Sequence, residues 1–217
     1  MAFENGIIRA DPMSHRPVEL WKKYLRQVRF VCISDTHEKM DEILDLIPDG
    51  DVLIHAGDFT EAGDVSAVIK FNQQIGKLPH KVYGIKIYGA PWHPMPGYSF
   101  YRQRGQALLQ KWNQIPNKTD VLITHTPPLG HGDFNAWTKL GGMLAGCAEL
   151  LNTVEYRVKP KYHVFGHIHQ QHGCTTNGVT TFINASTCDH KLRTEYDPII
   201  FDMPLPYGRS KDEVIVL

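Results

Sequence analysis

Four short polar segments with carboxylate or imidazole side chains follow apolar runs along this chain. The apolar runs cover residues 29–33, 52–56, 121–124 and 162–165, and each is typical of a buried strand. Carboxylate oxygen and imidazole nitrogen together suit Mn, Fe, Zn or Ni, whereas an all-oxygen set suits Mg or Ca. The pattern therefore predicts a site for two metal ions. Its candidate metal ligands are Asp35, His37, Asp58, His125, His167 and His169.

The strands must bring these side chains together. In an open α/β sheet, ligands bind beyond the carboxyl ends of the strands, so residues far apart in sequence can meet there. His167 and His169 lie two residues apart in a Gly-His-x-His segment. Alternate residues of an extended chain point to the same side, so both imidazoles can face one metal cluster. The chemistry is expected at one edge of the sheet.

Other elements complete an α/β pattern. Helical periodicity predicts helices over 40–47, 65–75 and 143–158, and a short helix that begins at Pro17 and leads into the first strand. Strands alternating with helices indicate a layered α/β domain. Two long connections, 89–105 and 126–142, carry many aromatic residues and are candidates for binding loops. Further strands are expected over 82–88, 179–183 and 198–201.

Length and charge restrict the class of protein. A chain of 217 residues suits one domain, and its 23 basic and 23 acidic side chains cancel. No overall field would therefore gather a nucleic-acid polymer or hold the chain on an anionic membrane. Residues 1–20 lack a secretory apolar segment, and no apolar run approaches the ~20 residues of a membrane span. We expect a soluble cytoplasmic protein whose four cysteines are free thiols.

Six longer runs around these segments carry a family resemblance. The runs are Arg29-Phe-Val-Cys-Ile-Ser-Asp-Thr-His37, His55-Ala-Gly-Asp-Phe-Thr-Glu61, Ile87-Tyr-Gly-Ala-Pro-Trp92, Thr124-His-Thr-Pro-Pro-Leu-Gly130, His163-Val-Phe-Gly-His-Ile-His169 and Ile183-Asn-Ala-Ser-Thr-Cys188. Together they resemble the calcineurin-like metallophosphoesterase superfamily, and more narrowly the metallophosphoesterase-domain-containing proteins of the brain and fetal-brain type. The resemblance implies a sandwich of two β-sheets flanked by helices over residues 29–217, preceded by an N-terminal extension, 1–28.

The resemblance also implies roles for the six ligands. Asp35, His37 and His169 would hold the first metal, and Asp58 would bridge to the second. His125 and His167 would hold the second metal. The implied activity is hydrolysis of phosphodiesters of nucleotide type, with cyclic nucleotides among the candidates, by a metal-bound hydroxide. The expected partner is therefore a small phosphoester or nucleotide substrate.

One family motif is missing from this chain. The family has a Gly-Asn-His motif between the counterparts of Asp58 and His125, whose Asn ligates the second metal and whose His assists the substrate. No Asn-His pair occurs here. Residues 77–81 and 84–92 nearly abut, whereas in the family several dozen residues separate their counterparts. We therefore expect a domain shortened near 81–84 and a weakly bound second metal, with no catalytic residue assigned. The alternative function is a catalytically impaired nucleotide- or metal-binding protein.

Several further polar and aromatic residues have two interpretations. His55 and His163 lie within strands, where buried hydrogen-bonded imidazoles are expected more often than ligands. His93 and His131 lie in the long loops and could stand in for the missing His, although solvated loop residues are the simpler expectation. The candidates for substrate contact are Trp92 and Asn184. The alternatives are that Trp92 packs its loop onto the domain and that Asn184 caps a turn.

Overall fold

The computed structural model describes residues 27–75, 85–136 and 142–205. The predicted N-terminal helix lies outside these residues, apart from Gln27 and Val28, which belong to the first strand. The expected shortening near 81–84 also falls outside the described residues. Of the strand predicted over 82–88, the structure describes residues 85–88 only. The division into residues 1–28 and 29–217 therefore stays a prediction.

A three-stranded sheet forms one half of the fold, in the order β10-β1-β2. Its strands are β1 (Gln27–Ile33), β2 (Val52–His55) and β10 (Ile199–Pro204). Strands β1 and β2 are parallel, with Ile33 opposite His55, and β10 runs antiparallel to β1. The carboxyl ends of β1 and β2 therefore meet at the same edge.

A five-stranded sheet forms the other half, in the order β3-β4-β7-β9-β8. Its first four strands, β3, β4, β7 and β9, are parallel neighbours, and β8 pairs antiparallel with β9 at the edge. The bounds are β3 (Ile87–Ala90), β4 (Val121–Thr124), β7 (Tyr162–Phe165), β9 (Thr181–Asn184) and β8 (Gly173–Thr176). A short two-stranded ribbon, β5 (Phe134–Asn135) with β6 (Met143–Leu144), lies apart from both sheets.

The two sheets pack face to face through alternate residues of their strands. Val28, Phe30 and Cys32 of β1 belong to one buried cluster with Val121 and Val164 of the five-stranded sheet. Successive strand residues point to opposite faces, so the intervening residues of β1 face outward. Such face-to-face burial removes apolar surface from water and is the main stabilising contribution to this half of the core.

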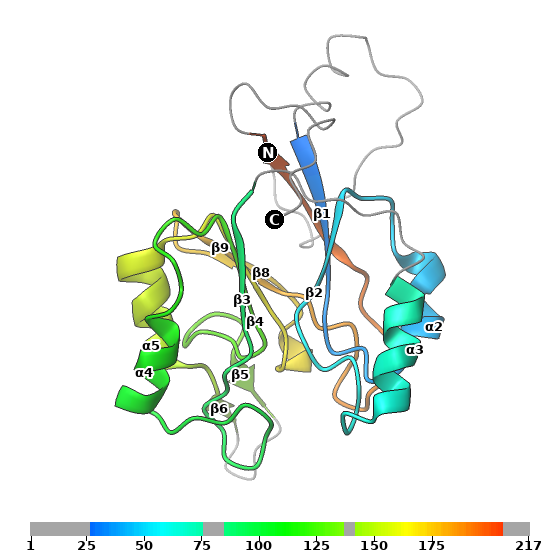
Figure 1. The fold of residues 1–217 in the computed structure, drawn as a ribbon, viewed down its shortest axis with the longest axis horizontal. Coiled ribbons are helices and arrows are strands. Elements are labelled where there is room, and N and C mark those ends of the chain that lie inside the picture. Colours follow the sequence, from blue (N-terminus) through cyan, green and yellow to red (C-terminus); the bar gives the residue numbers. More distant parts are fainter. Residues whose placement is uncertain (1–26, 76–84, 137–141, 206–217) are drawn as a thin grey trace.

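Helices cover the outer face of each sheet (Figure 1). Helices α2 (Met40–Ile43) and α3 (Val65–Ile75) lie beside the three-stranded sheet, where Ile33 packs with Met40 and Ile43. Helices α4 (Gln106–Trp112) and α5 (Ala148–Asn152) lie on the five-stranded sheet. Three further helical segments complete these elements: η2 (Leu44–Leu46), η3 (Thr153–Val158) and η4 (His169–Gln171). The predicted α/β sandwich of two sheets flanked by helices is confirmed.

The helix predicted over 143–158 begins later than expected. Met143 and Leu144 form β6 and are both 54% exposed, and the helical segment starts after Cys147, whose sulfur accepts from Leu150 N. Ala145 N donates to Asp133 O, so this segment pairs with the preceding loop instead of forming a helical turn. Strand β8 and helix α4 were not predicted. Across the described ranges, no helix has the length and apolar character that a bilayer span requires.

Candidate metal centre

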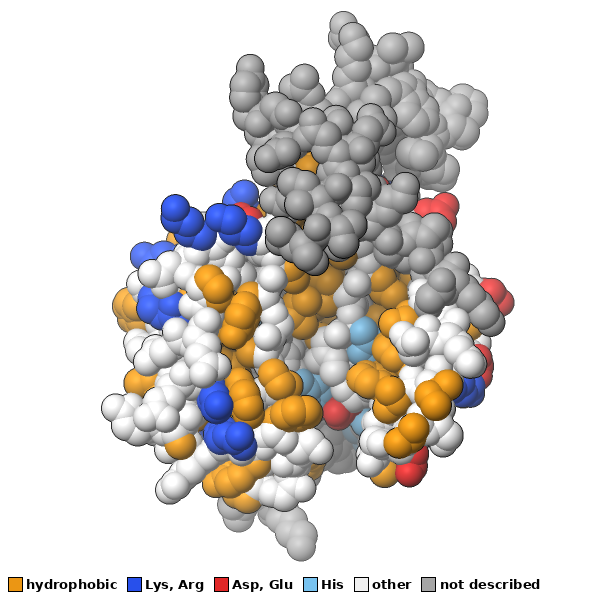
Figure 2. All heavy atoms as spheres, viewed as in Figure 1, with side chains coloured by type: hydrophobic (Ala, Val, Ile, Leu, Met, Phe, Trp, Pro, Cys, Tyr) orange, Lys and Arg blue, Asp and Glu red, His pale blue; other side chains and the backbone are white. Residues whose placement is uncertain are grey.

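The predicted ligands converge because the loops after the parallel strands bond to one another. Asp35 N, directly beyond β1, donates to Gly57 O beyond β2 at 2.9 Å. His37 N donates to Asp58 O at 3.0 Å, and Gly166 N donates to His125 O at 3.2 Å. The last of these bonds links the loops after β4 and β7. Figure 2 shows histidine and acidic side chains in the depression between the two halves of the molecule.

Four of the six predicted ligands have a strained backbone. Their φ angles lie in the left-handed region, which costs an L-residue roughly 1–2 kcal/mol. The angles are +53° at Asp35, +43° at His37, +51° at Asp58 and +71° at His167. Strained residues persist only where the surroundings over-determine them, and they cluster at functional sites. The strain at these four residues therefore indicates that the surrounding structure fixes the positions of their side chains.

Two glycines allow the ligand loops to approach closely. A Cβ on Gly166 would lie 1.9 Å from Asp35 Oδ2 and 2.2 Å from Ser34 Oγ. A Cβ on Gly57, whose φ is +110°, would lie 2.7 Å from His125 Nδ1. Real atoms cannot approach so closely, so each position requires glycine.

The side chains form two overlapping groups of metal-ligating atoms. Asp35, His37 and His169 make the first group, and the second contains Asp35, Asp58 and His125. Within each group the donor atoms lie within 4.8 Å of one another. Asp35 belongs to both groups, whereas Asp58, the predicted bridging ligand, belongs only to the second.

Asp35 is buried and held in one orientation. Its Oδ2 accepts from Ser186 Oγ at 2.9 Å and from His167 N at 3.0 Å. Its Oδ1 lies 3.2 Å from His169 Nε2 and 3.9 Å from His125 Nε2. Burial acts to raise the pKa of Asp35, but the hydrogen bond from His169 and the charge of His125 hold it well below its usual value. The carboxylate is therefore ionised at neutral pH.

Two imidazoles are oriented through their Nδ1 atoms. His125 Nδ1 donates to Ala56 O at 3.1 Å, and His169 Nδ1 donates to Asp189 O at 2.9 Å. These bonds direct Nε2 of each ring to the carboxylates, the arrangement that usually orients metal-ligating histidines. His125 Nε2 lies 3.3 Å from Asp58 Oδ2.

His167 lies beside the second group but outside both. Its Nε2 is 3.1 Å from His93 Nε2, and its ring centroid is 5.1 Å from that of His125. Burial and the neighbouring His125 lower the pKa of His167 to about 3, so its imidazole is neutral. His93 is only 2% exposed. The expectation that His93 is a solvated loop residue was wrong, because its loop folds back onto the site.

Comparison with known proteins identifies the family of the chain. Residues 28–97 match the family described as calcineurin-like phosphoesterase. Metallophosphoesterase domain-containing protein 1 of Homo sapiens is 40% identical over 238 residues, which cover 82% of this chain and 72% of that protein. A UPF0046 protein of Caenorhabditis elegans is 55% identical over 280 residues, covering 96% of this chain and 100% of the relative. The chain belongs to the calcineurin-like phosphoesterase family.

The alignment with the Caenorhabditis elegans relative is longer than this chain. Its 280 positions exceed the 217 residues of the chain by 63, so the relative has residues without a counterpart here. Among solved structures, a phosphopantetheinyl hydrolase from Mycobacterium tuberculosis matches 82% of this chain and 96% of its own, at 12% identity and a TM-score of 0.48.

Family membership indicates a metal-dependent phosphoesterase as the general class of activity. The family generally binds divalent metals, and the residues of this phosphoesterase fit such ions. Both groups combine ionised carboxylate oxygen with imidazole nitrogen, a set that suits Mn, Fe, Zn or Ni. The hydrogen bonds that hold Asp35, His125 and His169 supply the orientation that metal ligands need.

The affinity of this phosphoesterase for Mn is expected to rise with pH. Burial acts to lower the pKa of His125, but its hydrogen bond to Asp58 and the charge of Asp35 outweigh this and raise the pKa to about 9. Below pH 9, binding must displace this proton, because only a neutral imidazole can ligate a metal. Each displaced proton makes affinity rise up to about tenfold per pH unit. Calorimetric titrations at pH 6, 7 and 8 test this, and a pH-independent affinity would contradict it.

An open cleft of about 440 Å³ lies over the metal ligands. His37, Asp58, His167 and His169 form part of its wall. Its other lining residues are Tyr98, Asn135, Ile168, Gln170 and His190, which sequence reasoning did not single out individually. The aromatic composition of the loop over 89–105 was the available signal for Tyr98, and adjacency to His169 was the signal for Gln170.

Trp92 lies away from the metal ligands. Its ring packs against the buried cluster that includes Leu108 and Trp112, on the helical side of the five-stranded sheet. Arg102 and Lys111 place their cationic groups 4.6 and 4.3 Å from its centroid. This geometry matches the packing interpretation, and substrate contact by Trp92 stays a prediction.

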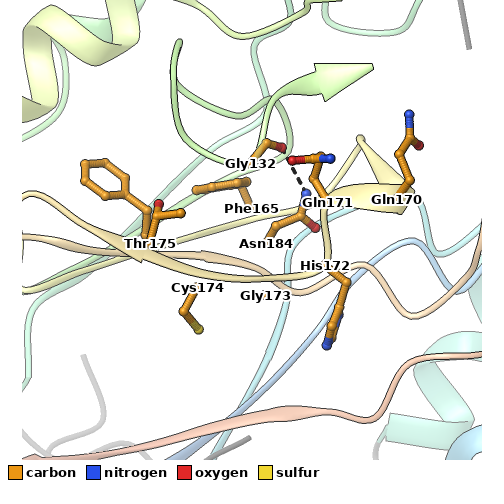
Figure 3. Close-up of a pocket in the computed structure, with 10 residues that line it drawn as sticks. Gly132, Phe165, Gln170, Gln171, His172, Gly173, Cys174, Thr175 and Asn184 are labelled. Atoms are coloured by element: carbon orange, nitrogen blue, oxygen red, sulfur yellow. Dashed lines mark hydrogen bonds between the residues drawn. The ribbon is translucent and has the colours of Figure 1, made fainter. Parts of the chain in front are cut away.

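Asn184 holds two loops with its side-chain amide. It is 1% exposed, and its Nδ2 donates to Ile168 O at 2.9 Å. The same Nδ2 donates to Gly132 O at 3.2 Å, as Figure 3 shows. Its Oδ1 accepts from Ser186 N at 3.1 Å. The residue lines a cavity of about 350 Å³ that none of the six predicted ligands lines. Substrate contact by Asn184 also stays a prediction.

The remaining strand and loop histidines take part in packing. His55 and His163 bond to the hydroxyls of Thr36 and Thr124, each at 2.9 Å, which confirms their expected role as hydrogen-bonded imidazoles of the strands. His131 stacks on Phe182 with ring centroids 3.6 Å apart, and its side chain is 15% exposed. His131 is therefore partly buried, in contrast to the nearly fully buried His93.

Proposed function

We propose that this chain hydrolyses phosphodiesters of nucleotide type with two divalent metal ions. The observation that carries the proposal is the pair of donor groups that share the buried carboxylate of Asp35. The ions would be Mn, Fe, Zn or Ni, the metals that suit mixed oxygen and nitrogen ligands. The first would bind Asp35, His37 and His169.

The second ion would bind His125 and His167, with Asp58 bridging the two ions. The side chain of Asp58 is 43% exposed and lines the cleft, so it can contact both an ion and solvent. Bound divalent ions would activate water and stabilise charge on the phosphoryl oxygens. The protein would hold the substrate in the cleft and keep the ligands in place. Because the Asn of the family motif is absent, the second ion would bind more weakly.

The cleft supports a small organic phosphoester as substrate. Its volume of about 440 Å³ lies within the range of small-molecule sites. Tyr98 lines it and is 55% exposed, so the ring face that does not stack on His93 would be open to a planar group. The formal net charge of the chain is zero, so attraction of an anionic substrate depends on local charge.

A second candidate function is binding without efficient turnover. The relative's alignment contains residues without a counterpart here, and the sequence lacks an Asn-His pair. A block missing near residues 81–84 would remove that motif and its metal ligand. In that case the chain would act as a nucleotide- or metal-binding protein.

Replacing Asp58 with Asn separates the two candidates. The proposed enzyme should hydrolyse bis-p-nitrophenyl phosphate or a cyclic nucleotide with added Mn, and Asp58→Asn should reduce the rate by about 100-fold or more. We expect a reduction of this size because loss of a residue that only hydrogen-bonds a metal ligand already costs about 10–100-fold in metal affinity or activity. Asp58 is itself a proposed ligand. Release of p-nitrophenol measures the rate directly.

Asp45→Asn is the matched control, because Asp45 is exposed in η2 and belongs to neither donor group. It should retain the full rate. A wild-type rate equal to that of Asp58→Asn would exclude metal-dependent hydrolysis at this site. Retention of Mn and nucleotide without turnover would favour the binding function.

A further inference from the structure

His93 reaches the metal centre from a fifth parallel strand. It follows β3, which ends at Ala90 and runs parallel to β4, so both loops leave the sheet at the same edge. Its ring centroid lies 4.4 Å from that of His167 and 6.2 Å from that of His125. The backbone of His93 bonds to that of Phe100 and Arg102, which closes the loop around it.

The hydrogen bonds of His93 determine where its proton lies. Met95 N donates to His93 Nδ1 at 3.0 Å, so Nδ1 presents its lone pair. An imidazolium carries a proton on both ring nitrogens, so this bond excludes the charged form of the ring. A neutral imidazole has one N–H and one lone pair. The proton of His93 is therefore on Nε2, the atom that faces His167.

This tautomer makes His93 a donor toward the site and not a metal ligand. Its only lone pair is taken by Met95, so Nε2 has none to offer an ion. In the structure Nε2–H donates to His167 Nε2 at 3.1 Å. His167 also has one acceptor nitrogen, and it cannot accept this proton and ligate a metal with the same lone pair. When His167 ligates a metal through Nε2, that lone pair no longer accepts the Nε2–H of His93, and the His93 donor is free for another acceptor.

We propose that His93 donates its Nε2–H to a phosphoryl oxygen of the substrate bound at the second metal. The inference rests on the proposed function and deepens it, since it assigns a substrate-contacting residue from this chain's own loop. Tyr98 stacks on the ring with centroids 5.3 Å apart and planes 26° from parallel, which limits rotation of the imidazole. A fixed donor needs no reorganisation when charge develops on the phosphoryl oxygens.

The test compares three substitutions of His93 in the Mn-loaded protein. His93→Ala removes the donor, His93→Gln places an amide N–H near the position of imidazole Nε2, and His93→Asn places one near Nδ1. Three quantities are measured for each: bound Mn by elemental analysis, the affinity for inorganic phosphate by calorimetry, and kcat for bis-p-nitrophenyl phosphate. His131→Ala is the control, because His131 lies in the other long loop and stacks on Phe182.

The expected result is that phosphate affinity and turnover fall while Mn content stays constant. Loss of one positioned donor costs roughly 10²-fold in kcat. His93→Gln should recover much of the phosphate affinity that His93→Ala loses, and His93→Asn should not. Gln and Asn differ in the reach of the same amide, so their comparison stands even if either change lowers stability. His131→Ala should match wild type in all three measurements.

Three results would overturn the inference. Loss of one Mn equivalent in His93→Ala would make His93 a ligand, and unchanged phosphate affinity in that variant would remove it from the substrate site. Equal behaviour of Gln and Asn would exclude a donor at Nε2. If wild type turns over substrate and His93→Ala matches it, only this inference falls. If wild type neither binds phosphate nor turns over substrate, the proposed function falls with it.

Discussion

Asp35→Asn is expected to remove bound metal and to reduce phosphodiester turnover by about 10²–10⁴-fold. Asp35 is a proposed ligand of the first ion and also lies within the second donor group, so one substitution is expected to weaken both sites. Loss of a residue that only hydrogen-bonds a metal ligand costs about 10–100-fold, and loss of a proposed ligand that lies in both donor groups should cost at least as much. Elemental analysis and the rate with added Mn measure the two effects.

The substitution also disturbs the hydrogen bonds that hold the carboxylate. Both oxygens of Asp35 accept bonds, from His167 N and from Ser186 Oγ. Asn has one acceptor oxygen, so its amide N–H₂ must face one of these donors, and an unsatisfied buried group costs about 1–3 kcal/mol. Thermal unfolding should therefore shift downward together with the loss of metal.

Asp202→Asn is a matched control for this change. Asp202 pairs with Arg29 at 3.0 Å on the three-stranded sheet, away from the ligands, and both side chains are partly exposed. Exposed pairs contribute about 0–1 kcal/mol. We expect this variant to keep its metal and its rate. Full metal retention in Asp35→Asn would contradict the assignment of Asp35 as a metal ligand.

Gly166→Ala is expected to lower the thermal midpoint by roughly 2–12 °C and to displace Asp35. The new Cβ would lie 1.9 Å from Asp35 Oδ2 and 2.8 Å from Ser34 Cβ. Overpacking of this kind costs typically about 1–3 kcal/mol, and each kcal/mol shifts the midpoint by about 2–4 °C for a chain of this size. Because the clash falls on the shared carboxylate, metal affinity should decrease as well.

Gly89→Ala supplies the comparison for Gly166→Ala. Gly89 lies in β3, and a Cβ there would meet no atom within 4 Å. The variant should unfold close to the wild-type temperature and retain metal. A Gly166→Ala protein as stable and as metal-rich as Gly89→Ala would show that the β7 loop tolerates a side chain beside Asp35.

The sequence by itself determined the sheet elements and the chemistry at their ends. The strands at residues 121–124 and 162–165 were predicted with the bounds that the structure has, because a buried strand needs a continuous apolar run. Polar residues directly beyond parallel strands meet at one edge whatever the details of the loops. The ligand side chains of Asp35 and His169 therefore lie together as expected.

The tertiary structure decided how the long loops fold and which side chains they bring to the site. The segment 89–105 has no periodicity, so its sequence indicates neither face of the sheet. The structure directs His93 to the ligands and its neighbour Trp92 to the helical side. The proton position of His93 depends on Met95 N, and the position of Asp35 depends on Ser186, 151 residues away. Such contacts form only on folding, because strand propensity and residue type are local and the partners of a loop side chain are not.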